Sequence, residues 1–185
     1  MFGDIAAFLL STVFTLFGAV LILRFWMQCI RLQPYTPLAR TVYQVSDWLV
    51  LPLRRVFKGW GGLDWASLAG VWLTALIYIV LSLIALGISI QGIFPSAIWI
   101  ALMVSIKWGL NLIMWVTLIM VIMSWVNPNS PIMGILSELT APMLNPIRRF
   151  MPDLGGIDLS PLVLLLLTQV ALMVLGRLGL PVFLH

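Results

Sequence analysis

The sequence PLRRVFKGWGGLD occupies residues 52–64, and PIRRFMPDLGGID occupies residues 146–158. The two stretches align without a gap at a shift of 94 residues. The same shift aligns residues outside the motif, for example Pro34 with Pro128. The chain is therefore a tandem duplication, and we expect both copies to contain the same helices in the same order.

Outside this motif the chain is strongly apolar. Of its 185 residues, 62% are hydrophobic and 9% are charged, and the mean hydropathy is +1.13. Soluble domains are about half apolar and about a quarter charged. Four stretches without Asp, Glu, Lys or Arg each contain at least 18 residues, close to the roughly 20 that a membrane-spanning helix needs. These stretches are 5–23, 65–106, 108–137 and 159–176.

One of these stretches, 65–106, is too long for a single span and contains the helix-breaking sequence QGIFP. We place a turn there, at residues 91–96. The chain is then predicted to be an all-α polytopic membrane protein with four transmembrane helices, at residues 5–30, 65–90, 97–126 and 161–180. The first repeat covers 1–90 and the second 97–185. Because each repeat holds an even number of spans, the two copies should insert in parallel.

The loops at 31–64 and 127–158 should lie on the same side of the membrane. They contain seven of the ten Lys and Arg residues, and the positive-inside rule therefore places both loops in the cytoplasm and both termini outside. The seven are Arg31, Arg40, Arg54, Arg55, Lys58, Arg148 and Arg149.

Each loop is predicted to contain an amphipathic helix. Thr36-Pro37 and Ser130-Pro131 supply an N-cap hydroxyl followed by a proline at the first helical position. Behind each cap, apolar residues recur at spacings of 4, 3 and 4. They are Leu38, Val42, Val45 and Leu49 in the first copy and Ile132, Leu136, Leu139 and Met143 in the second. We expect these helices to end at Pro52 and Pro146, and to lie in the cytoplasmic interface or dip into the membrane.

The paired arginines Arg54-Arg55 and Arg148-Arg149 are candidates for lipid or partner docking. Adjacent guanidinium groups match phosphate oxygens, and these follow an interfacial helix. The alternative is that they only anchor the topology, as the positive-inside rule by itself predicts.

Asp64 and Asp158 each follow a Gly-Gly pair and precede a predicted span. They are candidates for helix caps, since an acidic group is favoured at a helix N-terminus. The alternative is that they coordinate a cation.

Ionisable residues inside spans are costly and therefore informative. Lys107 can reach the outer interface with its long side chain. Arg24 is expected either to extend toward the cytoplasmic headgroups or to pair with a polar side chain such as Asn111 or Gln169. The candidate intramembrane polar residues are Arg24, Lys107 and Asn111.

The composition also excludes several kinds of chemistry. His185 and Cys29 are the only histidine and cysteine in the sequence, so it offers no disulfide, zinc site or haem-attachment motif. No cofactor, metal site or enzymatic activity is expected, because no nucleophile, base and acid cluster is visible. The net charge of +4 lies beside apolar spans, which favours contact with anionic lipid headgroups over nucleic acid.

The doubled PxRR and GGxD signature resembles the YggT family in its two-repeat bacterial form. The segments 23–28 and 124–126 fit the resemblance as well, and it extends over nearly the whole chain. The first copy departs from the family pattern, with Lys58 at the position of Pro152 and Ala66-Ser67 at that of Ser160-Pro161.

The resemblance implies an integral protein of the bacterial inner membrane. Relatives are linked to osmotic-shock tolerance and potassium handling, and also to division, nucleoid organisation or cytochrome assembly. Two hypotheses follow: a small channel or transporter in its own right, or a non-catalytic scaffold whose basic loops dock lipids and other membrane proteins. The shortage of polar groups in the spans favours a scaffold or accessory subunit of an ion-transport system.

Overall fold

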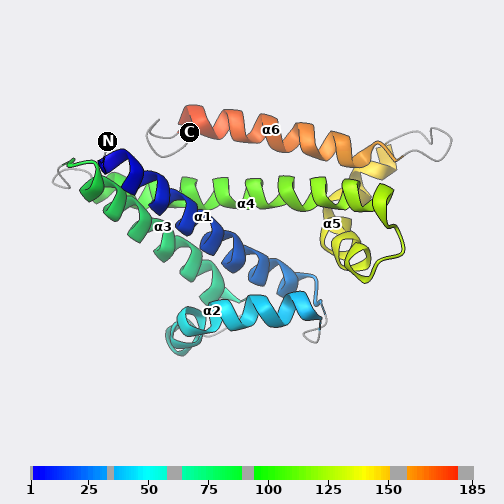
Figure 1. Cartoon of the computed structure of the whole chain (residues 1–185), viewed down its shortest axis with the longest axis horizontal. Helices are drawn as coiled ribbons and strands as arrows, with labels where there is room; N and C mark the ends of the chain where they lie inside the picture. Colours follow the sequence, from blue (N-terminus) through cyan, green and yellow to red (C-terminus); the bar gives the residue numbers. More distant parts are fainter. Residues whose placement is uncertain (1, 33–35, 58–63, 89–93, 151–157, 179–185) are drawn as a thin grey trace. The chain divides into compact units, whose positions relative to one another are not determined.

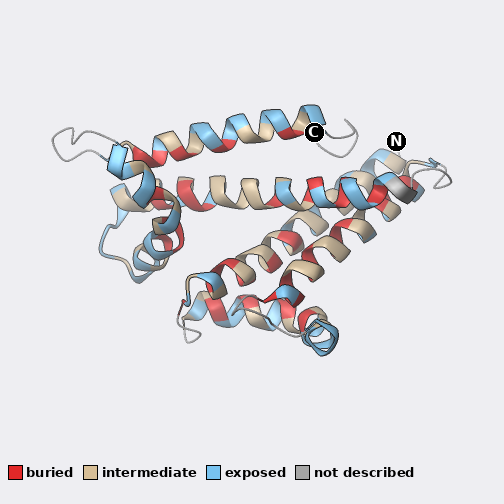
Figure 2. Cartoon of the chain, turned by 180° about the vertical axis from the view of Figure 1, so that it is seen from behind, coloured by how far each residue is buried: buried red, intermediate tan, exposed pale blue. Residues whose placement is uncertain are grey.

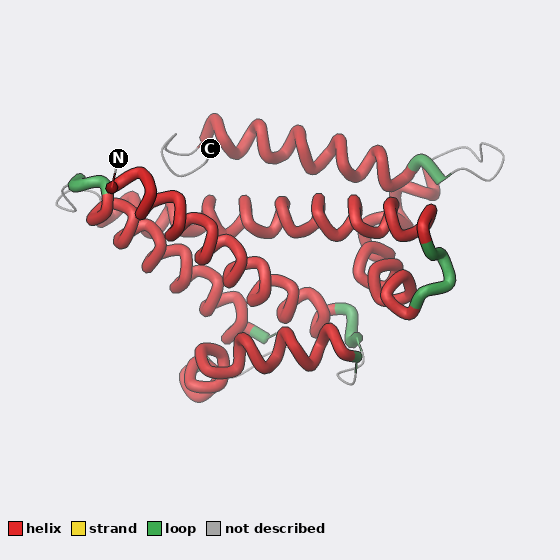
Figure 3. Tube along the Cα trace, in the orientation of Figure 1, coloured by secondary structure: helices red, strands yellow, loops and turns green. Residues whose placement is uncertain are grey.

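The computed structural model describes residues 2–32, 36–57, 64–88, 94–150 and 158–178, and within them it contains six helices and no strands. Figure 1 labels the helices in chain order, and Figure 3 shows that helices make up most of the described residues. They are α1 (Phe2–Cys29), α2 (Pro37–Val56), α3 (Trp65–Ala85), α4 (Phe94–Val126), α5 (Pro131–Phe150) and α6 (Ser160–Leu178).

Four of these helices, α1, α3, α4 and α6, are long and apolar enough to cross a membrane. This confirms the four predicted spans. Helix α4 begins at Phe94, three residues before the expected start, and residues 91–93 of the predicted turn lie outside the described residues. The order span, amphipathic helix, span occurs twice, as the duplication requires.

The chain forms two compact units. One consists of residues 1–109 with 176–185, and the other of residues 110–175. The first unit contains α1, α2, α3 and α4 up to Gly109, and the second contains the rest of α4, α5 and α6 up to Leu175. In the first unit α1 packs against α3, and α2 contacts both (Figure 1).

The predicted starts of the amphipathic helices are confirmed. The Thr36 hydroxyl accepts the backbone N–H of Ala39 at 3.3 Å, and the Ser130 hydroxyl accepts that of Met133 at 3.2 Å. Each hydroxyl satisfies one of the backbone donors that a helix leaves unpaired in its first turn.

The predicted ends of these helices are wrong. Pro52 and Pro146 lie inside α2 and α5, which continue to Val56 and Phe150. A proline removes one backbone donor and crowds the preceding turn. If later residues form helical hydrogen bonds again, the helix bends at the proline and does not end there. Phe57 does resume it, with its N–H donating to the Leu53 carbonyl at 2.8 Å. Figure 1 shows that α2 changes direction in its C-terminal part.

The face that α2 and α5 bury also differs from the prediction. It is centred on Val42, Ser46 and Val50 in α2, whereas Val45 is exposed. In α5 the equivalent residues Leu136, Thr140 and Leu144 are buried, together with Leu139 (Figure 2). The apolar pattern missed the central position because a hydroxyl residue occupies it in both copies.

Candidate functional site

An ion pair joins the end of α2 to the start of α3. The Arg54 Nη2 donates to Asp64 Oδ2 at 2.7 Å, and its Nε donates to Oδ1 at 3.3 Å. The Ser67 hydroxyl of α3 also donates to Asp64 Oδ2, at 2.7 Å. Because Arg54 lies in the last turn of α2 and Asp64 directly precedes α3, this two-pronged contact fixes one helix to the other.

The second copy repeats this ion pair. Arg148 Nη2 and Nε donate to Asp158 Oδ2 at 2.7 and 2.9 Å. The other carboxylate oxygen accepts the backbone N–H of Ser160 at 2.9 Å and also the Ser160 hydroxyl. The pairs Arg54–Asp64 and Arg148–Asp158 are called the Arg–Asp clamps below. In each copy the clamp joins the first arginine of the PxRR motif to the aspartate of the GGxD motif.

The two clamps differ in exposure. The Asp64 side chain is 7% exposed, whereas that of Asp158 is 43% exposed. Burial raises the pKa of Asp64, but hydrogen bonds from Arg54 and Ser67 and the Arg54 charge outweigh it, so its pKa lies below the ordinary value. Burial also raises the pKa of Asp158, and hydrogen bonds from Ser160 and Arg148 again lower it overall. Both carboxylates are ionised at neutral pH.

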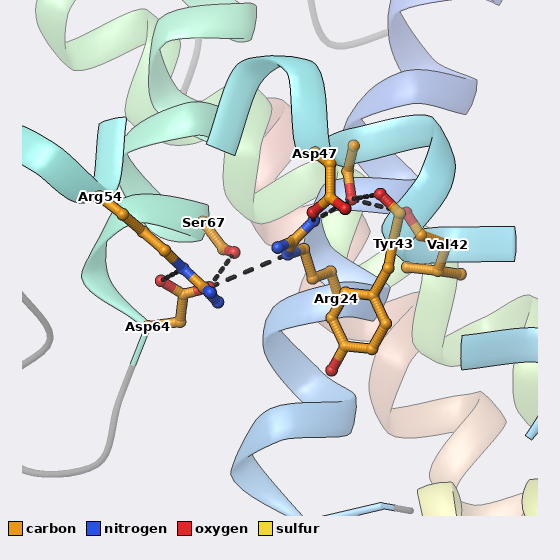
Figure 4. A network of polar contacts seen from close by, with 8 residues as sticks. Arg24, Val42, Tyr43, Asp47, Arg54, Asp64 and Ser67 are labelled. Carbon is orange, nitrogen blue, oxygen red and sulfur yellow. Dashed lines mark hydrogen bonds and ion pairs between the residues drawn. The ribbon is translucent and has the colours of Figure 1, made fainter. Parts of the chain in front are cut away.

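The first copy adds a buried arginine to its clamp. Arg24 of α1 is 1% exposed, and its Nη1 donates to Ser46 Oγ at 2.6 Å and to Asp47 Oδ1 at 2.7 Å. Its Nε lies 3.9 Å from Asp64 Oδ2, and its guanidinium lies 4.7 Å from the centre of the Tyr43 ring. Figure 4 shows Arg24 reaching between α2 and the start of α3.

This arrangement, called the Arg24 network below, balances its own charge. Two arginines, Arg24 and Arg54, meet two carboxylates, Asp47 and Asp64. A buried charge is tolerated when paired and hydrogen-bonded, and removing one partner is costly. The network therefore holds α1, α2 and the start of α3 in one arrangement.

The second copy lacks the side chains needed for such a network. At the shift of 94 residues, Arg24 and Asp47 correspond to Leu118 and Ala141, and Tyr43 corresponds to Ser137. Ser46 corresponds to Thr140, whose hydroxyl contacts the Met120 sulfur at 3.0 Å. The same junction is thus ionic in the first copy and mainly apolar in the second.

The structure separates the predicted arginine pairs. All four arginines are exposed, but only Arg54 and Arg148 are held in the clamps. Each repeated pair therefore contains one arginine that is bound to an aspartate and one that takes no part in a clamp.

Of the two carboxylates predicted as helix caps, only one accepts a hydrogen bond from a backbone N–H of the helix that follows it. Asp64 stands at the N-cap position of α3, but its side chain accepts no backbone N–H there. Asp158 does accept one, from Ser160. Within the described residues no group of three or more His, Cys, Asp or Glu could hold a metal ion.

Arg24, Lys107 and Asn111 are the residues that were predicted to lie within the membrane. The partners of Arg24 are Ser46, Asp47 and Asp64, in place of the suggested Asn111 or Gln169, because α2 folds back against the end of α1. Lys107 and Asn111 lie on α4 with half-buried side chains.

Sequence reasoning missed Ser46, Asp47 and Tyr43. Comparing the copies could have found Asp47, since Arg24 and Asp47 are replaced together by Leu118 and Ala141. A buried arginine requires a carboxylate, and a charged pair present in one copy and absent from the other indicates a contact.

The four apolar helices, the repeated amphipathic helices and the clamps define a helical membrane protein built from two copies of one module. The sequence profile of the CCB3/YggT family matches the chain twice, at residues 3–85 and 99–179, so the chain belongs to the CCB3/YggT family.

Similar proteins occur in several bacteria. The chain is 43% identical over 166 residues to the Escherichia coli (strain K12) protein named "Uncharacterized protein YggT", covering 88% of this chain and 85% of that protein. It is 38% identical over 172 residues to a Vibrio alginolyticus protein named "Uncharacterized protein in proC 3'region", covering 92% of each. No solved structure matches the chain.

Proposed function

We propose that this protein is a non-catalytic membrane scaffold or accessory subunit that presents two amphipathic helices to lipids and to other membrane proteins. The observation that carries the proposal is the Arg–Asp clamp, which occurs in both copies. Arg54–Asp64 and Arg148–Asp158 tie the end of each amphipathic helix to the start of the next span. A helix held in this way offers a fixed surface.

The clamps also argue against Asp64 and Asp158 as sites for a transported cation. A cation would have to compete with an arginine that already forms two hydrogen bonds to each carboxyl group.

The proposed place of action is the bacterial inner membrane, with both loops in the cytoplasm. The excess of Lys and Arg in the loops supports this orientation. A labelling experiment tests it in a variant whose native cysteine is removed by Cys29→Ser. A cysteine introduced by Arg40→Cys should react with a membrane-impermeant maleimide only after the cells are opened. Reaction in intact cells would reverse the orientation.

The proposed physiological role is a contribution to osmotic-shock resistance and potassium homeostasis, through an ion-transport system that the scaffold supports. The family resemblance suggests this role, and the scaffold geometry fits an accessory part better than an autonomous pathway. Cells lacking the protein should recover slowly from an osmotic upshift, and wild-type protein should restore recovery.

The decisive experiment measures potassium and sodium flux in proteoliposomes that contain only this purified protein. We expect flux equal to that of empty vesicles. A second sample carries Asp64→Asn and Asp158→Asn together, as the matched control for a carboxylate-dependent pathway. Flux in the wild type that this double variant loses would overturn the scaffold proposal and make the protein a channel or transporter.

A further inference from the structure

The outer face of α2 carries an exposed row of side chains that its counterpart in the second copy does not share. Gln44, Trp48, Leu51 and Arg55 recur at spacings of 4, 3 and 4, and all four are exposed. Trp48 is 67% exposed and Leu51 is 52% exposed. Before the bend at Pro52, this row lies opposite the buried face formed by Val42, Ser46 and Val50.

The equivalent row on α5 is composed differently. The shift of 94 residues leads to Glu138, Pro142, Asn145 and Arg149, which are also exposed. The terminal arginine is therefore common to both copies. The large apolar pair, Trp48 and Leu51, occurs only in the first, which makes α5 a control built into the same chain.

The depth of Trp48 follows from its contact with α1. Its ring stacks on that of Phe17, with the ring centres 5.4 Å apart. Phe17 lies seven residues before Arg24 along a spanning helix, about 10 Å further from the loop end of that helix. Trp48 therefore reaches the apolar zone of the membrane, where an exposed tryptophan and leucine are favoured.

Arg55 lies at the other end of the row. It follows Arg54, which is bound to Asp64 directly before the N-terminus of α3, where the span begins. The exposed side chains thus change from an apolar pair, of which Trp48 lies at the depth of Phe17, to a guanidinium group beyond the bend at Pro52 and next to the clamp with Asp64. This order matches a phospholipid, whose acyl chain is apolar and whose phosphate is anionic.

We propose that the row Gln44, Trp48, Leu51 and Arg55 of α2 is a binding site for one anionic phospholipid of the bilayer. Its acyl chain packs on Trp48 and Leu51, and Arg55 holds its phosphate. The proposal rests on the scaffold role of α2 and deepens it, since it names the ligand and confines the site to the first copy.

The first arm of the test measures the depth of the two rows. In the Cys29→Ser background, Leu51→Cys and Asn145→Cys each receive a nitroxide spin label, in bilayers of phosphatidylethanolamine and phosphatidylglycerol. Collisions with oxygen report lipid, and collisions with a water-soluble nickel chelate report water. We expect the label at 51 to collide mainly with oxygen and the label at 145 mainly with nickel. Nickel access at both positions would overturn the proposal, and would indicate a water-facing surface suited to a protein partner.

The second arm measures the phosphate contact. Native mass spectrometry compares how much phosphatidylglycerol the full-length protein retains against phosphatidylcholine. Arg55→Gln should lower the retained phosphatidylglycerol about fivefold, which corresponds to the ~1 kcal/mol that one basic residue contributes at an anionic membrane surface. Arg149→Gln is the matched control and should change it little. Equal loss from both variants, or loss from neither, would overturn the proposal.

The outcome is independent of the scaffold test. Ion flux in the proteoliposomes would contradict the scaffold role. It would not change how much phosphatidylglycerol Arg55→Gln retains relative to Arg149→Gln. Conversely, equal retention by these variants would remove the lipid site and leave the flux result unchanged.

Discussion

Arg24 donates a hydrogen bond of 2.7 Å to Asp47, and this contact joins a transmembrane helix to the amphipathic helix that follows it. The two partners differ in environment, since the Arg24 side chain is almost fully buried and that of Asp47 is 42% exposed. In the second copy the corresponding residues are Leu118 and Ala141. The second copy therefore supplies the substitutions that test the first.

Replacing Asp47 alone should be the most damaging of these changes. Asp47→Ala leaves Arg24 buried with only the more distant Asp64 as a charged partner, and we expect a loss of about 2 kcal/mol in the free energy of unfolding. Arg24→Leu should cost less, about 1 kcal/mol, because Asp47 can then be hydrated. The double variant should be more stable than the sum of the single losses predicts. Thermal unfolding in mild detergent measures all three, and strictly additive losses would contradict the network.

The acid sensitivity of the first copy should depend on Asp64. The pKa of Asp64 lies below its ordinary value of 3.8, so its clamp stabilises the fold above that pH and is lost as the pH falls through the lowered pKa. The unfolding temperature of the wild type should therefore fall as the pH is lowered from 5 through about 3. Asp64→Asn should unfold at a lower temperature at pH 7 and show a weaker pH dependence. A variant as acid-sensitive as the wild type would contradict this role.

Asp158→Asn is the matched control for that experiment. The lowered pKa of Asp158 gives the same sign, so its contribution also disappears on acidification. Its carboxylate is much more exposed than that of Asp64, and solvent screens its interaction with Arg148. We expect Asp158→Asn to change the pH profile less than Asp64→Asn does.

The two arginines of each pair should respond differently to lysine. Arg54→Lys keeps the charge but loses the two-pronged contact with Asp64, and should lower the free energy of unfolding by about 1 kcal/mol. Arg55→Lys should leave the stability unchanged, because Arg55 takes no part in the clamp. Thermal unfolding of the two variants side by side checks this, and equal losses would mean that the clamp does not distinguish them.

Gly18 and Trp108 predict a packing effect in the first unit. A Cβ added at Gly18 would lie 2.2 Å from the Trp108 ring, so Gly18→Ala should destabilise the protein by about 2 kcal/mol through overpacking. Gly109→Ala is the control, since its Cβ would lie 4.0 Å from Ile22, an ordinary contact. The unfolding temperature should fall only for Gly18→Ala. In a Trp108→Ala background, which itself loses a buried ring, adding Gly18→Ala should cause no further fall, because the clash has been removed.

Much of the fold follows from the sequence. Charge-free stretches and the repeated signature are long-range patterns, and they located the four spans and the starts of α2 and α5. The predicted ends of those helices were wrong. A proline removes one backbone hydrogen bond, but whether the helix continues depends on the turn that follows, where Phe57 bonds to Leu53.

The candidate site was only partly predictable. The signature identified Arg54, Asp64 and their copies, but not that they contact one another, because pairing depends on how the chain returns after α2. Ser46 and Asp47 look like solvent-facing positions in an amphipathic pattern. They become partners of Arg24 only once α2 packs against α1.

The unequal exposure of Arg24 and Asp47 has an evolutionary consequence. A duplicated ancestor began with identical junctions, so one copy has since gained or lost both charges. Asp47 without Arg24 is a hydrated surface carboxylate that selection can tolerate, whereas Arg24 without Asp47 is a buried cation with a distant counterion. The evolutionary intermediate between the two kinds of junction is therefore one that has the aspartate but not the arginine. Homologous repeats with the aspartate alone should be more frequent than repeats with the arginine alone.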